Sequence, residues 1–258
     1  MQAKVIILGS GGSMGVPVIG CPCPVCHSKE PLNKRFRPSI VLQVEGKNIL
    51  FDCGPDFHSQ AIAQEIKDID AFLLTHTHFD HIAGLDDLRI FSLRKQAAIP
   101  CYLSQKSYDD LRKRYYYLFE KDDESVVRLN YNVLNKPAGL FKVLGVDCHY
   151  FTYYQGSMEV AGYRIGNFAY VTDIKRYEEE LFDHLIGVEY LILSMQRKDA
   201  SHAHLSLEDV IAIRERVHPQ HCYITHMGHD IDYHDLKESL PAGILPAFDG
   251  LSFWINLD

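Results

Sequence analysis

Short apolar runs of strand length recur along the chain, with Gly, Pro, Asn and Asp between them. Runs of about four to eight residues rich in Val, Ile, Leu, Phe and Tyr are typical of buried β-strands. The pattern predicts strands over residues 4–9, 39–45, 48–54, 71–75, 146–152, 163–166, 168–173, 190–194, 222–226 and 251–257. The first three strands precede any segment with a helical pattern, so the chain is expected to open as an all-strand block.

From residue 57 onward, segments whose apolar residues recur with a helical period alternate with the strands. They predict helices near residues 57–67, 84–96, 175–185 and 206–217. Residues 109–121 also have helical spacing, with aromatic residues on more than one side, and either cover a site, join two subunits or pack in the core. Two halves of strands followed by helices, with no linker, predict an α/β fold. We expect two sheets packed face to face with helices outside, in a single domain over residues 1–258.

The composition is that of a globular protein, with 47% hydrophobic and 23% charged residues. The net charge of -8 argues against a surface built to coat nucleic acid. No apolar run approaches the roughly 20 residues of a membrane span, and the N-terminus lacks the cleavage region of a signal peptide. Seven cysteines, an odd number in a long chain, are typical of a reducing compartment. We therefore expect a cytoplasmic protein with no membrane partner.

The stretch CPCPVC places Cys21, Cys23 and Cys26 on a proline-stiffened loop. Cysteines two or three positions apart rarely reach disulfide geometry, and three thiols would leave one unpaired. Three thiolates can form part of a tetrahedral structural zinc site, which needs a fourth ligand. The residues alone leave open whether these thiols bind zinc or are unrelated to one another, and His27 is one candidate for the fourth ligand.

The strongest chemical signal is THTHFDH, residues 75–81, which follows a buried strand. Alternation along the chain sends His76 and His78 to one side, where two imidazoles can share a metal ion. Asp80 and His81 turn toward a second ion. A polar loop that is histidine-rich by chance is the alternative, but four ligand-type residues in six positions at a strand end favour a metal centre.

These motifs resemble a known family. H-x-H-x-D-H after a strand is the signature of the metallo-β-lactamase fold, a four-layer αββα sandwich whose hydrolases carry one or two metal ions. The resemblance covers nearly the whole chain and is strongest to the PhnP-like branch of phosphoribosyl cyclic phosphate phosphodiesterases. It is carried by LGSGGSMGVPVIGCPCPVC, FDCGPDF, LLTHTHFDHIAGLDDLR, YVTD, YITHMGHDIDY and FDG. The protein of pyrroloquinoline quinone biosynthesis is a more distant relative with a similar cysteine cluster.

The resemblance implies a fourth ligand for the three cysteines. In the PhnP-like branch this ligand is a histidine three residues after a histidine of the catalytic metal site, and His229 and His226 have that spacing. The cysteines and His229 would then hold one structural zinc ion in an N-terminal arm, residues 10–38. His226 would face the catalytic site, so one loop would connect the arm to the active centre.

The resemblance also assigns the remaining catalytic positions. Asp173 falls where the family has a carboxylate that bridges both metal ions, although an N-cap of the following helix is an alternative on spacing alone. His226 matches the last ligand of the second metal ion. His204 is similar to a histidine that the phosphodiesterases use near the leaving group, and His202 is close enough to exchange roles with it.

One position departs from the family pattern. The family usually has a histidine followed by glycine where this chain has Gln155 and Gly156. That histidine completes the ligand set of the first metal ion, and a glutamine amide is a poorer zinc ligand than an imidazole. His149 could substitute only if its strand slipped, so we expect it to be an ordinary strand residue. The first metal site is therefore expected to be weak.

The resemblance implies a metal-dependent hydrolase, and most specifically a phosphodiesterase acting on a small, linear or cyclic phosphodiester. Two divalent ions, zinc or manganese, would lower the pKa of a bound water so that hydroxide attacks phosphorus. Asp80 would orient that hydroxide, and His204 would protonate the leaving group or steady a phosphoryl oxygen. Alternatives are a binding protein that kept the fold but lost turnover, and a hydrolase of another ester, a lactone or a nucleic-acid phosphodiester. Nucleic acid is disfavoured as a partner, and the sequence leaves open whether the protein forms a homodimer.

Overall fold

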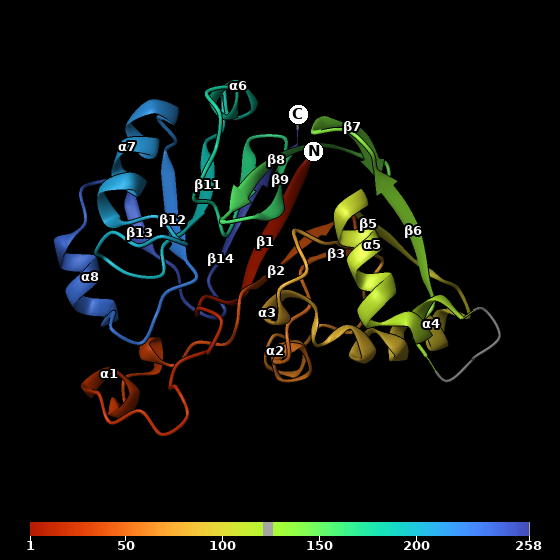
Figure 1. Cartoon of the computed structure of the whole chain (residues 1–258), viewed down its shortest axis with the longest axis horizontal. Coiled ribbons are helices and arrows are strands. Elements are labelled where there is room, and N and C mark those ends of the chain that lie inside the picture. The colour runs from red at the N-terminus through yellow and green to blue at the C-terminus, as the bar shows by residue number, and fades with distance from the viewer. Residues whose placement is uncertain (121–125, 258) are drawn as a thin grey trace.

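Two seven-stranded β-sheets pack face to face, with helices on their outer sides (Figure 1). The coordinates are a computed structural model that describes residues 1–120 and 126–257. The two sheets and their flanking helices confirm the predicted αββα sandwich. Within the described ranges, no helix has the length and apolar character needed to cross a membrane.

The first sheet has the strand order β14-β1-β2-β3-β4-β5-β6. Its strands are β1 (Gln2–Gly9), β2 (Ser39–Val44), β3 (Lys47–Phe51), β4 (Ala71–Leu73), β5 (Ile99–Ser104), β6 (Leu129–Leu134) and β14 (Ser252–Asn256). The second sheet has the order β13-β12-β11-β10-β9-β8-β7. Its strands are β7 (Ala138–Val143), β8 (Val146–Gln155), β9 (Met158–Ile165), β10 (Phe168–Val171), β11 (Tyr190–Ser194), β12 (His221–Thr225) and β13 (Ile244–Pro246).

The apolar runs form strands because both faces of each sheet are covered. In β1, Val5 and Ile7 point into the core between the sheets, where they meet residues of the second sheet such as Tyr163. Ile6 and Leu8 of the same strand point to the other side, into the core beneath the helices. Since side chains alternate along a strand, a strand buried on both faces shows a continuous apolar run, which is the pattern of residues 4–9.

Except for the predicted helix over 206–217, which the structure confirms at Leu207–Val217, the helices are shorter than their sequence patterns suggest. They are α1 (Pro24–His27), α2 (Phe57–Ala63), α3 (Phe79–Ile82), α4 (Arg89–Lys95), α5 (Gln105–Arg114), α6 (Leu181–His184), α7 (Leu207–Val217) and α8 (Tyr233–Ser239), with 3-10 turns η1 (Pro31–Asn33), η2 (Leu85–Leu88) and η3 (Tyr116–Phe119). The predicted helix over 84–96 is a 3-10 turn followed by α4, and the one over 175–185 is helical only in α6. The expected helix over 109–121 begins earlier, in α5, and its last residue, Lys121, lies outside the described residues.

Several elements were not expected from the sequence. Strands β5, β6, β7 and β13 and helix α8 have no counterpart among the predicted elements. Strands β6 and β7 are the edge strands of their sheets, and most of their residues are only partly buried. Edge strands with half-exposed side chains mix polar and apolar residues, as in LNYNVL, so their periodicity is weak.

The topology gathers several strand ends at one edge of the sandwich. Strands β3 and β4 run parallel in the first sheet, and β10, β11 and β12 run parallel in the second. Parallel strands present their carboxyl ends at the same edge of a sheet, where the loops that follow them meet. The N-terminal arm reaches the same edge, because the backbone N–H of Gly12 donates to the carbonyl of Met227, just after β12.

Candidate metal centre

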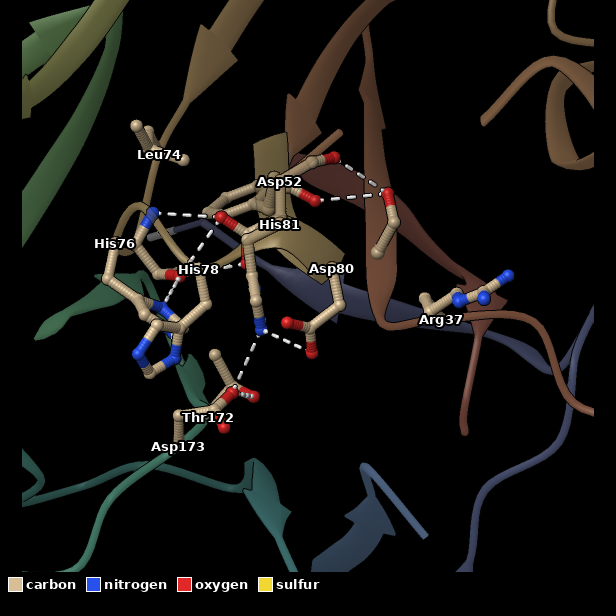
Figure 2. A network of polar contacts seen from close by, with 12 residues as sticks. Arg37, Asp52, Leu74, His76, His78, Asp80, His81, Thr172 and Asp173 are labelled. Carbon is tan, nitrogen blue, oxygen red and sulfur yellow. Dashed lines mark hydrogen bonds and ion pairs between the residues drawn. The ribbon is translucent and has the colours of Figure 1, made fainter. Parts of the chain in front are cut away.

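Three strand ends deliver the ligand-type side chains predicted from the sequence, and Figure 2 shows those that follow two of these strands. His76 and His78 follow β4, and a nitrogen of each ring lies 2.9 Å from the other, His76 Nε2 to His78 Nδ1. Asp173 follows β10 and His226 follows β12. The two sheets therefore contribute to one cluster, in which His76, Asp173 and His226 are buried.

A second part of the cluster contains Asp80, His81, Asp173 and His226. The Nε2 atom of His81 lies 3.1 Å from Asp173 Oδ2 and 3.4 Å from Asp80 Oδ2. The Nε2 atom of His226 lies 3.2 Å from Asp80 Oδ2 and 3.2 Å from Asp173 Oδ1. The structure thus brings together the residues that the sequence assigned to a second metal ion, and Asp173 faces both parts of the cluster.

Three residues of this region have left-handed backbone conformations that favour glycine. The φ angles are 59° at Asp52, 54° at Asp173 and 61° at His226. Such values are uncommon for residues with a Cβ atom, and they persist where the surrounding structure enforces them. Two of the three residues carry ligand-type side chains at strand ends, so the strained backbone aims these side chains into the cluster.

Asp52, after β3, was not among the residues predicted for the site. Its Oδ2 lies 2.7 Å from Nδ1 of His81, and both groups are fully buried. Thr75 holds the carboxylate in place, because its backbone N–H and its hydroxyl both donate to Asp52. A carboxylate that accepts a hydrogen bond from a metal-binding histidine fixes the orientation of the ring. It also keeps the proton on the ring nitrogen that faces the carboxylate, so the other nitrogen is left to bind metal. The motif FDCG at a strand end is the signal that could have found it.

The arrangement around His81 fits a divalent cation. With the Nδ1 proton donated to Asp52, the lone pair on Nε2 faces two carboxylates, and this buried atom has no hydrogen-bond partner. Burial opposes charge on His81, yet Asp52, Asp80 and Asp173 raise its pKa well above the usual range. Electron pairs from an imidazole and two carboxylates converge on one position, where a positive charge is required. Imidazole and carboxylate are suitable ligands for zinc and manganese.

Gln155 and His204 complete the wall of the cluster. The Nε2 atom of Gln155 lies 3.0 Å from Asp173 Oδ1 and 3.2 Å from His204 Nε2, and Gln155 Oε1 is buried without a hydrogen-bond partner. Burial and the neighbouring His226 lower the pKa of His204 to about 4, so this imidazole is neutral at pH 7. His202 is exposed, which favours His204 for the buried role.

His149 lies away from the cluster. It pairs with Arg164 between β8 and β9, and its ring centroid is 4.8 Å from that of His184 in α6. The position of Gln155 at the end of β8, beside Asp173, agrees with its alignment to the family histidine.

The second expected site also assembles. A ligand atom from each of Cys21, Cys23, Cys26 and His229 lies within 4.8 Å of the others. The Nδ1 atom of His229 is 3.2 Å from the sulfur of Cys21 and 3.5 Å from that of Cys23. The backbone N–H of Cys26 and the His229 ring lower the pKa of the Cys23 thiol to about 6, which favours the thiolate that binds metal. His27 is exposed and lies outside this group.

Two arginines of the basic segment over residues 33–39 are engaged by other parts of the chain. Arg35 is buried, and its guanidinium donates to the carbonyls of Gly228 and Ile231. Arg37 pairs with Asp56 at 2.8 Å. Arg35 therefore fastens the loop that carries His229 to the arm.

The likeness to known proteins agrees with this geometry. Residues 47–227 match the Beta-lactamase superfamily domain. The chain belongs to the β-lactamase superfamily. Among solved members, a diphosphatase from the PhnP family is 35% identical with a TM-score of 0.91, and the match covers 100% of this chain and 98% of that chain. This superfamily chain therefore lies close to the PhnP family, as the motifs suggested.

Two further relatives limit what can be concluded about this chain from its similarity to known proteins. The octanoyltransferase of Porphyromonas gingivalis is 35% identical over 256 residues, which is 98% of this chain but 52% of that protein. This superfamily chain thus spans about half the length of that curated relative, whose name applies to the longer protein. Zinc-bound PqqB from Methylobacterium extorquens has a TM-score of 0.79 over 97% of this chain and 99% of its own. Its 20% identity supports a shared fold only.

Proposed function

We propose that this β-lactamase superfamily hydrolase is a metal-dependent phosphodiesterase that cleaves a small, linear or cyclic phosphodiester. The observation that carries the proposal is the convergence of Asp80, His81, Asp173 and His226, with a buried imidazole lone pair facing two carboxylates. Divalent ions held there, zinc or manganese, would activate water and neutralise charge on phosphoryl oxygens. His76 and His78, with Asp173, would form the first of two binding positions. Asp80, His81 and His226, again with Asp173, would form the second.

Asp80 and His204 have distinct roles in the proposal. Asp80 presents a carboxylate oxygen to both His81 and His226, so it accepts a proton or hydrogen bond from a water held at that position. His204 has a lowered pKa and is neutral at pH 7, so its ring N–H serves as a hydrogen-bond donor to a phosphoryl or leaving oxygen. This favours the steadying role over protonation of the leaving group by an imidazolium.

Diphosphate cleavage is a second candidate, because the 35% identical solved structure is a diphosphatase. Both reactions break a P–O bond and require the same charge stabilisation. A non-catalytic, metal-binding role is the competing interpretation, since Gln155 occupies the place of a family ligand. The four cysteine and histidine ligands of the arm would hold one structural zinc.

The test is an assay of purified protein whose metal content has been measured. Bis(p-nitrophenyl) phosphate, a cyclic nucleotide and a dinucleoside diphosphate are offered with added zinc or manganese. Phosphodiester cleavage that is lost on chelation and restored by metal supports the proposal, whereas cleavage of the diphosphate alone favours the second candidate. Full metal loading with no cleavage of any of the three would favour the binding protein.

The proposed partner is a small molecule rather than a nucleic acid or a membrane, in keeping with the net charge of -8. All seven cysteines are free thiols, which supports the proposal of a reducing, cytoplasmic location. A homodimer through α5 and the residues after it stays a prediction.

A further inference from the structure

A cavity of about 720 Å³ opens beside the candidate metal centre. Apart from the ligand-type residues, its lining comes from four separate segments: Ser13, Phe79, Gln155–Met158 and His202–His204. None of these residues, nor any other lining residue that the structure describes, is Lys or Arg. Pockets that bind compounds with several phosphates usually present Arg or Lys forks to them, so this lining suits a compound with few negative charges.

Phe79 is an exposed, large apolar side chain in this lining. It stands between His78 and Asp80 at the start of α3, and its exposed fraction is 60% although both neighbours belong to the metal cluster. Its neighbours on both sides are ligand-type residues of the cluster, so the ring stands directly beside the candidate metal centre. An aromatic ring in such a place offers a flat apolar face on which a flat substituent can stack.

Two more apolar side chains share the cavity with Phe79. Met158 follows the turn between β8 and β9, and Ala203 lies one residue before His204. Gly156 of the same turn has no atom within 4 Å of the position of a Cβ, so the turn leaves open space beside Met158. The walls around the metal centre are therefore partly apolar, and a methionine adapts its shape to a flat group.

Three basic side chains next to the lining segments already have carboxylate partners. Arg37 donates to the carbonyl of Ser13, but its guanidinium pairs with Asp56. The other two pairs are Lys106 with Glu159, which follows Met158, at 2.9 Å, and Lys175 with Asp209 at 3.2 Å. A second phosphate on the substrate would have to break one of these pairs, or draw Arg176 away from the Tyr154 ring, where its guanidinium lies 5.0 Å from the ring centroid.

We infer that the substrate is a singly charged phosphodiester in which one substituent of the scissile phosphate is aromatic, and that this group stacks on Phe79 and contacts Met158. The inference rests on the proposed function, and it narrows the substrate class. Divalent ions held by the metal-binding side chains would take the phosphoryl oxygens, while Phe79 and Met158 would recognise the substituent. Stacking on an exposed ring in a partly enclosed cavity typically contributes about tenfold or more in affinity.

The test uses equilibrium binding, so that it does not depend on turnover. The monomethyl esters of phenylphosphonate and methylphosphonate, which carry one negative charge as a phosphodiester does, and monomethyl phenylphosphonate with an added para-phosphonate are titrated into metal-loaded protein by calorimetry. We expect the phenyl ester to bind about tenfold more tightly than the methyl compound, and the compound with the added phosphonate to bind no more tightly than the phenyl ester. Equal affinity for the phenyl and methyl compounds, tighter binding of the compound with the added phosphonate, or no binding of any of them would overturn the inference.

Variants separate stacking from a general effect on the site. Phe79→Ala should reduce the phenyl-to-methyl affinity ratio to about one to threefold, whereas Phe79→Tyr should retain it. Tyr116→Ala is the matched control, because Tyr116 is an aromatic residue with a similar exposed fraction of 65% outside the cavity, and it should leave the ratio unchanged. Metal content is measured for each variant. If no diester is hydrolysed but the ratio behaves as expected, the proposed function fails and the binding inference stands.

Discussion

The side-chain amide nitrogen of Gln155 lies 3.0 Å from Oδ1 of Asp173, the carboxylate that faces both parts of the metal cluster. In this orientation the amide donates to the carboxylate rather than offering its own oxygen beside it. His76 and His78 are then left with Asp173 as the strong ligands of the first position. This hydrogen bond also occupies Asp173 Oδ1, an oxygen that the carboxylate would use to bridge two metal ions. The two metal positions are therefore not equivalent.

Replacing Gln155 with histidine should strengthen metal binding at the first position. An added imidazole supplies a ligand that the family has, and even a change behind the ligands typically alters metal affinity by about 10 to 100-fold. We expect wild-type protein to lose one catalytic metal ion on mild chelation and Gln155→His to retain it, as measured by elemental analysis. Wild-type protein that keeps two catalytic ions through the same treatment would contradict the assignment. If Gln155→His also raises turnover, the wild-type protein is a weakened enzyme. If the variant gains metal occupancy without turnover, the wild-type site is specialised.

Removing ligands of the second position should abolish hydrolysis. Asp80→Ala and His81→Ala each delete a side chain whose atoms lie within 3.4 Å of the facing ligand atoms, and the remaining three residues bind metal less tightly. Turnover and metal content are measured, with circular dichroism to show that the fold is intact. Near-normal turnover in either variant would mean that this position takes no part in the chemistry.

His204 and His202 can be distinguished by a pair of alanine variants. His204 is buried against Asp173 and His226, whereas His202 is exposed at the cavity mouth. Loss of a positioned hydrogen-bond donor to the reacting phosphate should lower kcat by about 10² to 10⁴-fold in His204→Ala. His202→Ala should lower it far less. An equal loss in both variants, or a larger loss in His202→Ala, would exchange the two roles.

The residues of the candidate metal centre were predictable because they are concentrated in sequence or mark a strand end. THTHFDH alone supplies four of them, and a strand that stops at polar ligand types indicates a site. His229 and Asp173 required the family resemblance, since nothing local to either residue distinguishes a ligand from a loop residue. Asp52 was missed because its role depends on a contact with His81, 29 residues away, that only the parallel pairing of β3 and β4 creates.

The elements that the sequence did not predict also depend on contacts between residues distant in the sequence. Residues 175–180 were expected to be helical, but the backbone of Lys175 and Arg176 instead pairs with the carbonyl of Tyr154. That long-range contact satisfies backbone groups that a helix would otherwise use, and tertiary structure overrides local propensity there. Most strands buried on both faces were clear in the sequence, whereas β5 and the edge strands β6, β7 and β13 were not.

The cysteine cluster gives a stability prediction. If Cys21, Cys23, Cys26 and His229 hold zinc, then Cys23→Ser should lower both the zinc content by one equivalent and the melting temperature, because metal binding contributes directly to folding stability. The ligand types at the catalytic centre should not change. His27→Ala is the matched control, since His27 is exposed beside Cys26 but outside the cluster, and it should retain zinc. One zinc equivalent that remains in the double variant Cys23→Ser and His229→Ala, after removal of the catalytic ligands, would contradict the site.

Asp52→Asn tests how much of the metal centre depends on the residue behind His81. Asparagine keeps the shape of aspartate and tolerates a φ of 59°, so the backbone should be undisturbed. The amide is neutral, however, and it can turn its N–H₂ group toward His81 Nδ1, which would favour the wrong tautomer of the ring. We expect metal affinity at the second position to fall by about 10 to 100-fold, measured by competition with a chelating dye, with little change in melting temperature of the metal-free protein. Unaltered affinity would show that Asp52 serves the fold through Thr75 rather than the metal centre through His81.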